Sequence, residues 1–269
     1  MGDFNGKLLN LASIRVFIFW GGVLLFLILE RLIPYRPSSV SKVTRWVNNL
    51  GIGVFNSILL NLLFASFIMQ TTAYVNTRQI GVLNLWPLPY WVKVAAAVIF
   101  LDLILYVWHL LNHEVPFFWR FHRVHHSDLN LDVSTASRFH IGELSISAVI
   151  KAGLIFFLGA DLFSIVLFDS LVVLTSQFHH SSLTVPVWFE RLYWTLFVPP
   201  SMHRIHHSVV IKERNSNYGT IFSLWDRILE TLLSRIDQAR IQIGMGAYQK
   251  PEEMNFHHLL IMPFTKPVK

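Results

Sequence analysis

Long apolar runs are the feature of this sequence that most restricts its fold. Residues 14–33, 50–70 and 91–111 are mostly apolar, and each is close to the about 20 residues that a helix needs to cross a bilayer. A longer apolar stretch, residues 145–178, is interrupted at Gly159, Ala160 and Asp161. We expect two short helices there, forming a hairpin that enters the membrane and returns. The sequence therefore predicts an all-α integral membrane protein, with about four transmembrane helices or with three spans plus a hairpin.

The composition agrees with a membrane location. Of the 269 residues, 53% are hydrophobic and only 14% are charged, whereas soluble domains carry about 25% charged residues. The chain contains no Cys, which excludes disulfides, thiolate metal sites and a Cys nucleophile. The formal net charge of +6 suits a membrane face near anionic lipid better than a nucleic-acid surface, so we expect no nucleic-acid partner.

The loops between the apolar runs differ in their basic residues, and this predicts an orientation. Residues 34–49 contain three basic residues and no acid, and residues 112–144 contain three arginines. The positive-inside rule places both segments, and the chain after residue 178, in the cytoplasm. Residues 187–200 are rich in aromatic side chains, which predicts a helix lying in the membrane interface. We expect a multi-pass protein with a cytoplasmic, histidine-rich helical cap, divided into N-terminal spans (1–90) and a catalytic domain (91–269).

Histidines recur at helical spacing. The motif HRVHHS (122–127) is nearly repeated as HRIHHS (203–208), and HLLNH (109–113) ends the third apolar run. The offsets i, i+3 and i+4 place the rings of each motif on one face of a helix. Neutral imidazole suits Zn, Cu, Fe and Ni, and eight imidazoles exceed the needs of one metal ion. The motifs therefore predict two metal ions at one site, and iron is favoured because activated O₂ can attack an unactivated C–H bond.

Other classes of membrane histidine protein fit less well. A b-type haem carrier needs one axial His per helix rather than clusters. A metal transporter would place acids or histidines in several spans, which here are nearly free of them. A zinc hydrolase would be expected to carry His-Glu-x-x-His, and that string is absent. A membrane metal-binding or electron-transfer protein without oxygenase activity stays open as the alternative function.

Together, these motifs and their flanking sequences resemble the fatty acid hydroxylase / sterol desaturase superfamily of integral-membrane non-haem di-iron enzymes. The resemblance runs from about residue 91 to Phe264. It passes through WRFHRVHHSD (119–128), SRFHIGE (137–143), PPSMHRIHHS (199–208), NYG (217–219) and WDRILET (225–231). It implies metal ligation by His109, His113, His122, His125, His126, His203, His206 and His207.

The resemblance also implies one ligand from HHSS (179–182), where His180 fits the pattern and its neighbour His179 stays an alternative. Ser182 stands where the family usually has Asn. Polar residues near the motifs are candidates to ligate metal or to accept the distal ring N–H of a ligand. They are His140, His179, Asp128, Asp132, Glu143, Asn217 and Asp226. His257 and His258 lack the spacing and are expected to be surface residues.

The implied activity is hydroxylation or desaturation of a lipid, such as a sterol or a fatty acyl chain. It would use two Fe ions, O₂ as co-substrate and an external electron donor, such as a ferredoxin or cytochrome b5. Four basic residues on the cytoplasmic side could dock an acidic redox protein: Arg120, Arg123, Arg204 and Lys212.

Overall fold

The computed structural model describes the backbone of residues 2–266 and the side chains of residues 13–266. Within this part of the chain the fold is all-helical, with three isolated β-bridges and no strand. The long helices are α1 (Gly2–Leu32), α2 (Lys42–Leu60), α3 (Ser66–Arg78), α4 (Tyr90–Glu114), α6 (Ile141–Leu158) and α7 (Leu162–His180). The shorter helices are α5 (Pro116–His126), α8 (Val187–Trp194), α9 (Pro200–His206), α10 (Ile211–Arg214), α11 (Leu224–Ile228) and α12 (Phe256–Ile261). Short π or 3-10 segments are η1 (Asn61–Ala65), η2 (Val82–Asn84), η3 (Val133–Ser137), η4 (Pro251–Met254) and η5 (Met262–Phe264).

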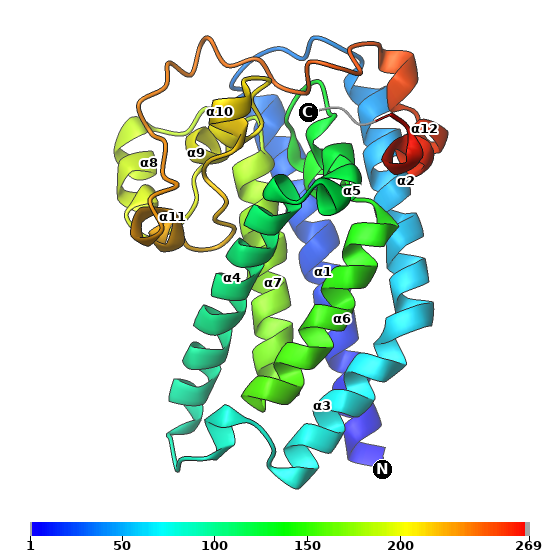
Figure 1. Ribbon diagram of the computed structural model, residues 1–269, viewed down its shortest axis with the longest axis vertical. Coiled ribbons are helices and arrows are strands. Elements are labelled where there is room, and N and C mark those ends of the chain that lie inside the picture. The colour runs from blue at the N-terminus through cyan, green and yellow to red at the C-terminus, as the bar shows by residue number, and fades with distance from the viewer. Residues whose placement is uncertain (1, 267–269) are drawn as a thin grey trace.

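Five helical stretches in the described part of the chain are long and apolar enough to cross a membrane. They are Ser13–Leu32, Lys42–Asn84, Tyr90–Glu114, Ile141–Leu158 and Leu162–His180. Figure 1 shows them running along the long axis of the molecule, with α5 and α8–α12 gathered at one end as a cap. The helical membrane architecture predicted from the apolar runs is thus confirmed.

The predicted hairpin at residues 145–178 is present as α6 and α7. Gly159 ends α6 in a left-handed conformation (φ 76°), which a residue without Cβ adopts at little cost. The Asp161 side chain then accepts a hydrogen bond from the Ser164 amide and begins α7. The helices have 18 and 19 residues, so each is long enough to cross the bilayer rather than only to enter it.

The second span is longer than the apolar run that predicted it. The helical stretch continues from α2 through η1 into α3, giving a candidate span of 43 residues. The π-turn η1 lies where α2 passes into α3, and such turns commonly accompany a change of helix direction. Figure 1 shows α3 leaning across the end of the bundle opposite the cap.

The spans are apolar on both their packed and outward faces. Large hydrophobic residues such as Phe17, Leu24, Leu62 and Trp91 are exposed, as expected for helices whose solvent is lipid. The largest buried cluster joins α4, α6 and α7 and includes Leu101, Ile155 and Phe168, together with Ile221 from the cap. The predicted interfacial helix corresponds to α8, which exposes Val187, Trp188 and Leu192.

The N-terminal spans are joined to the cap by buried charges. Arg45 of α2 donates to both Asp128 oxygens, at 2.6 and 2.8 Å, and to Asp132 at 2.6 Å. Asn49, one turn on, accepts from Arg138 at 2.8 Å. Each group has its partner, so the network stays inside the protein without an unpaired charge. The first 90 residues therefore help to position the segment that follows α5.

Candidate metal centre

The histidine motifs meet where the bundle joins the cap. His109 and His113 end α4, His122, His125 and His126 line α5, and His180 ends α7. His203 and His206 come from α9, and His207 is its C-terminal cap residue. All nine side chains are buried, with exposed fractions between 0% and 9%. Segments that lie up to almost 100 residues apart in the chain thus bring nine imidazoles together.

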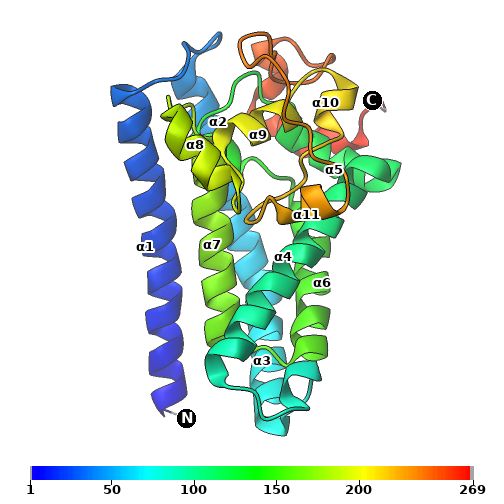
Figure 2. The same cartoon turned by 90° about the vertical axis from the view of Figure 1, so that its left-hand side faces the viewer.

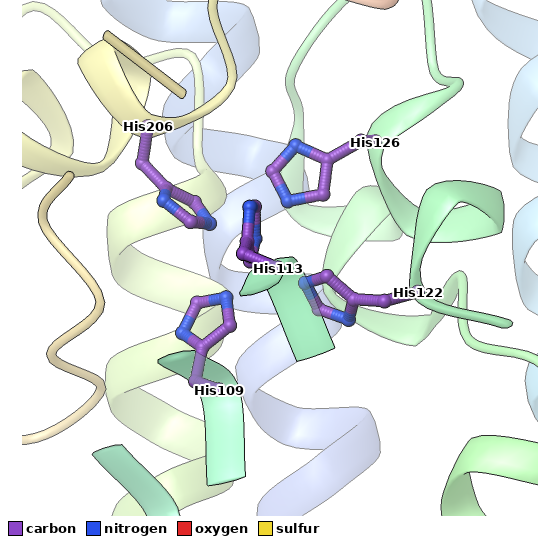
Figure 3. A group of neighbouring side chains, drawn as sticks. All are labelled: His109, His113, His122, His126 and His206. Atoms are coloured by element: carbon purple, nitrogen blue, oxygen red, sulfur yellow. The ribbon is translucent and has the colours of Figure 1, made fainter. Parts of the chain in front are cut away.

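The imidazoles form two groups that could each hold a metal ion. The five-histidine group consists of His109, His113, His122, His126 and His206, and the four-histidine group of His125, His180, His203 and His207. Within each group the ligand atoms lie within 4.8 Å of one another. Figure 3 shows the rings of the five-histidine group turned toward a common centre, from α4, α5 and α9.

Each HxxHH motif divides its histidines between the two groups. The first motif gives its i, i+4 pair, His122 and His126, to the five-histidine group and gives His125 to the other. The second motif does the reverse, because the pair His203 and His207 joins the four-histidine group and His206 joins the first. The two motifs are therefore not separate half-sites, since each motif bridges both groups.

The inward-facing nitrogens meet no protein group other than another imidazole. In the five-histidine group every Nε2 is buried without a hydrogen bond. In the other group Nε2 atoms face each other: His125 and His180 at 3.0 Å, His180 and His203 at 2.9 Å, and His203 and His207 at 3.1 Å. Neutral imidazoles that face one another through unprotonated nitrogens repel, and a buried polar atom without a partner is costly. A metal ion in each group would satisfy these nitrogens, so the residues present fit metal ligation.

Backbone carbonyls hold the outward-facing Nδ1 atoms of four rings. His109 donates to the Tyr218 carbonyl at 2.7 Å, and His206 to the Ser216 carbonyl at 2.8 Å. His180 donates to the Ser176 carbonyl at 2.7 Å and His125 to the Arg138 carbonyl at 3.2 Å. A carbonyl can only accept, so each contact places the proton on Nδ1 and leaves Nε2 as a free ligand atom.

One carboxylate takes part in this arrangement. Glu143, in the first turn of α6, accepts from His122 Nδ1 at 2.9 Å. Both side chains are buried. A carboxylate behind a ligand ring orients the ring and makes it a better donor to a metal.

Burial favours the neutral form of five imidazoles of α5 and the α9 region. Desolvation, reinforced by neighbouring imidazoles, holds the pKa values of His125, His126, His203, His206 and His207 well below the usual 6.5. An unprotonated ring is the form that ligates a metal. These five rings therefore present neutral nitrogens at physiological pH.

The remaining polar candidates lie around the site in other roles. Asp128 and Asp132 bind Arg45 rather than an imidazole. Burial alone would raise the pKa of Asp128, but the positive charge of Arg45 and Arg138 holds it below its usual range. His140 caps α6 by accepting from the Gly142 amide, and its Nε2 bonds to the Leu260 carbonyl.

Asn217 and Asp226 order the loop that carries the carbonyl acceptors. Asn217 has a positive φ of 57° and donates to the Met202 and Leu233 carbonyls. Asp226 accepts from the amides of Tyr218 and Gly219, both at 2.8 Å. They hold the backbone that in turn holds His109 and His206.

His179 lies beside the four-histidine group but not in it. Its ring centre is 3.9 Å from that of His203 and 4.7 Å from that of His180. Of the two neighbours, the structure thus brings His180 into the group. His257 and His258 lie on α12, outside both groups.

Sequence reasoning missed the residue that anchors this loop from within the membrane. Asp102 of α4 is fully buried and accepts from the amides of Ile221 and Phe222, at 3.2 and 3.1 Å, and from Trp225 Nε1 at 2.8 Å. The sequence did carry a signal for this role, because Asp102 is an acid inside an apolar run. Such residues are rare and usually have a specific partner.

Two of the four arginines and lysines expected to dock an electron donor are not at the surface. Arg123 is fully buried and donates to the carbonyls of Met262, Thr265 and Lys266, so it holds the C-terminal segment. Arg204 is also buried; its guanidinium carbon lies 3.8 Å from the centre of the Tyr35 ring. Both side chains point away from the histidines and are covered by protein. The expectation that Arg123 and Arg204 dock an electron donor is therefore wrong.

Comparisons with known proteins agree with this geometry. The family model described as fatty acid hydroxylase matches residues 94–231, the segment that holds all nine clustered histidines. Ornithine lipid hydroxylase OlsE of Rhizobium tropici is 29% identical over 182 residues, covering 67% of this chain and 52% of that protein. Alkylglycerol monooxygenase of Caenorhabditis elegans is 33% identical, covering 49% of this chain and 25% of the relative.

Human cholesterol 25-hydroxylase is 29% identical, covering 52% of this chain and 50% of the human protein. The chain thus spans about half or less of the length of these three relatives. No solved structure matches it significantly.

Proposed function

Because this chain belongs to the fatty acid hydroxylase family, we propose that it is a membrane-bound di-iron oxidoreductase that uses O₂ to hydroxylate a C–H bond of a lipid. The observation that carries the proposal is the pair of buried imidazole groups. Their inward Nε2 atoms have no hydrogen-bond partner in the five-histidine group and meet only one another in the four-histidine group. The names of the relatives, which are lipid hydroxylases and monooxygenases, favour hydroxylation over desaturation. We further propose that residues 91–269 form the catalytic part and residues 1–90 the supporting spans.

Two bound irons would supply the reduction of O₂ and hence the oxidising power that an unactivated C–H bond requires. The chain's own residues perform the remaining tasks. His109, His122 and His206 are held through Nδ1, so their Nε2 atoms are set before a metal arrives. Burial of every ligand excludes bulk water, which would otherwise quench a reactive species.

Lipid substrate would approach from the membrane side of the site. Below the histidines the bundle is apolar, with Leu101, Phe168 and Ile221 in one buried cluster. These side chains pack against one another, and such apolar surroundings favour a hydrocarbon substrate over a polar one. The proposal therefore names a lipid without choosing between sterol, acyl and ether lipids.

We propose that the cap faces the cytoplasm, where an electron donor such as a ferredoxin or cytochrome b5 would deliver electrons. The basic loops 34–49 and 112–144 support this orientation through the positive-inside rule. Arg120 and Lys212 are exposed and stay available to an acidic partner.

Metal analysis of the purified protein tests the proposal most directly. We expect about two metal ions per chain, with iron in the active form and no haem absorption band. Zinc can replace iron on heterologous expression, so the stoichiometry is the safer measure. One metal ion per chain, or a Soret band, would refute the di-iron site.

A membrane metal-binding or electron-transfer protein is the alternative function. Incubation of the iron-loaded protein with reductant, O₂ and candidate lipids separates the two. A hydroxylated lipid supports the oxygenase, whereas reversible oxidation of the metal with no lipid product from any class would support the alternative.

A further inference from the structure

Three charged side chains meet within the membrane spans, far from the histidines. Arg15 of α1 approaches Asp169 of α7 to 3.1 Å, and Lys151 of α6 approaches the other oxygen of the same carboxylate to 2.6 Å. Lys151 and Asp169 lie equally far in sequence from the turn at Gly159 to Asp161, and therefore at the same depth. We call these three residues the basic triad.

The basic triad lies inside the apolar region, toward the end opposite the cap. Asp169 follows Leu162, the first residue of α7, by seven positions, which places it about 10 Å along the helix axis. His180 lies eleven positions further on, about 16 Å away along the same helix. Figure 2 shows α1 and α7 running side by side to that end of the bundle. The triad is thus separate from the metal centre.

The charges of the basic triad do not balance. Two cations share one carboxylate, so the triad carries a surplus of one positive charge. The Asp169 side chain is only 10% exposed, whereas Lys151 is 26% and Arg15 is 52% exposed. The carboxylate is therefore enclosed by protein, while the cations present their remaining donors to the lipid. Ionisable groups inside a membrane are costly unless they are paired, and where they persist they commonly mark a site.

We propose that the basic triad binds the phosphate of an anionic phospholipid in the membrane leaflet opposite the cap, with the long side chains of Arg15 and Lys151 extending toward the headgroup level to meet it. A phosphate would neutralise the surplus charge and accept hydrogen bonds from Arg15, which suits oxyanions through its planar fork, and from Lys151. Because the triad joins α1 to the α6–α7 hairpin, the bound lipid would also hold α1 against the bundle.

The competing explanation is a purely structural triad, in which both cations serve only to neutralise Asp169. The two explanations differ in what happens when the carboxylate is removed. If the triad is purely structural, loss of Asp169 would remove the only reason for the two cations to be there. If the triad is a phosphate site, loss of Asp169 would leave both cations free to bind the lipid.

Thermal unfolding of the full-length protein in neutral detergent measures this difference. Phosphatidylglycerol and phosphatidylcholine with the same acyl chains are added separately, and inorganic phosphate is added as a third arm. We expect phosphatidylglycerol to raise the melting temperature by a few degrees more than phosphatidylcholine does, because a ligand that binds only the folded state stabilises it. Inorganic phosphate should have no such effect, and an equal effect would show a free-anion site and overturn the lipid proposal.

Substitutions then assign the effect to the basic triad. Arg15→Gln and Lys151→Gln should each reduce the excess stabilisation by phosphatidylglycerol, and Arg15→Lys should retain most of it. Asp169→Asn should lower the melting temperature without lipid but enlarge the response to phosphatidylglycerol. Arg78→Gln is the matched control, because Arg78 is an exposed cation at the same end of the bundle and forms no ion pair with any described residue.

Native mass spectrometry of the same variants counts the phosphatidylglycerol that stays bound, and it does not depend on baseline stability. The proposal is overturned if Arg15→Gln and Lys151→Gln retain the full lipid response, or if Asp169→Asn abolishes it. Equal losses in Arg78→Gln would show a non-specific surface effect and would also overturn it.

Discussion

A single imidazole in this protein performs two tasks with its two nitrogens. Where Nδ1 donates to a fixed acceptor, as in His109 and His206, the ring is oriented and its tautomer is set. The opposite nitrogen then projects into a buried space that holds no other partner. This division explains why the backbone of residues 216–218, which contributes no side-chain ligand, is nevertheless part of the site.

Glu143 should matter for metal retention because it holds the ring of His122. Removal of a carboxylate behind a ligand typically costs about 10–100-fold in metal affinity. We expect Glu143→Ala to lose metal faster than wild type when challenged with a chelator, while Glu143→Gln, which retains an acceptor oxygen, should lie between them. Metal content after timed chelation is the measurement.

Glu252→Gln serves as the control, because Glu252 is exposed and lies on η4. If Glu143→Ala releases metal no faster than this control, Glu143 does not support the ligand.

At the scale of elements, α5 and α9 each contribute to both histidine groups. His125 belongs to the four-histidine group, although its helix neighbours His122 and His126 belong to the five-histidine group. His206 belongs to the five-histidine group, although its neighbours His203 and His207 belong to the four-histidine group. A helix can do this because i+3 and i+4 lie on opposite sides of the direction of i. The spacing of the motif therefore matters as much as its composition.

Loss of one histidine should deplete one group. We expect His125→Ala to weaken the four-histidine group and His206→Ala the five-histidine group, so that each variant holds about one metal per chain and loses turnover. The control Arg123→Lys should keep about two metals, because Arg123 binds the C-terminal segment and no imidazole.

Metal stoichiometry of the folded variants is the measurement. Two metals and full activity in both His variants would exclude the repeated motif as a ligand set. Loss of metal from folded Arg123→Lys would show that the helical faces are misassigned.

The loop that carries Tyr218 depends on an anchor in α4. Asp102→Ala would leave the Ile221 and Phe222 amides and the Trp225 indole without their acceptor. One such buried group costs about 1–3 kcal/mol, so we expect a clear fall in melting temperature and weaker metal binding through His109. Asp237→Asn, an exposed acid, is the control. A wild-type melting temperature for Asp102→Ala would show that the loop has no need of this anchor.

For the whole molecule, the convergence of the motifs requires that they share one side of the membrane. Accessibility labelling is clean on this chain because it has no Cys. Ser38, in the loop between α1 and α2, and Ala239, in the segment between α11 and α12, are exposed, and so is Thr77 near the end of α3. Figure 1 shows both of these connecting segments at the cap end and α3 at the opposite end. We expect Ser38→Cys and Ala239→Cys to react from the cytoplasmic side and Thr77→Cys only from the other.

Reaction of Ser38→Cys and Ala239→Cys from different sides would be incompatible with the fold. Reaction of both from the outside would preserve the fold but reverse the proposed orientation. The serines of the repeated motifs, Ser127 and Ser208, are unsuitable for this test because both are buried.

The sequence by itself determined the helical membrane fold and the identity of eight of the nine clustered histidines; the ninth, His180, was implied only by the family resemblance, with His179 as the alternative. Both are local properties: about 20 apolar residues suffice for a span, and spacing of three and four places rings on one helix face. The turn at Gly159 and the apolar, aromatic surface of α8 could be predicted for the same reason.

Only the tertiary structure decided how the histidines divide into two groups and which acceptor atoms orient their rings. The division depends on how α4, α5, α7 and α9 cross, and no local pattern encodes that. The sequence predicted that Asp128 could accept from a histidine, but in the structure it binds Arg45 of α2. The two residues are 83 positions apart, and only the packing of α2 brings them together. Carbonyl acceptors such as that of Tyr218 are invisible in sequence, since every residue has a carbonyl and only packing selects the one that meets His109.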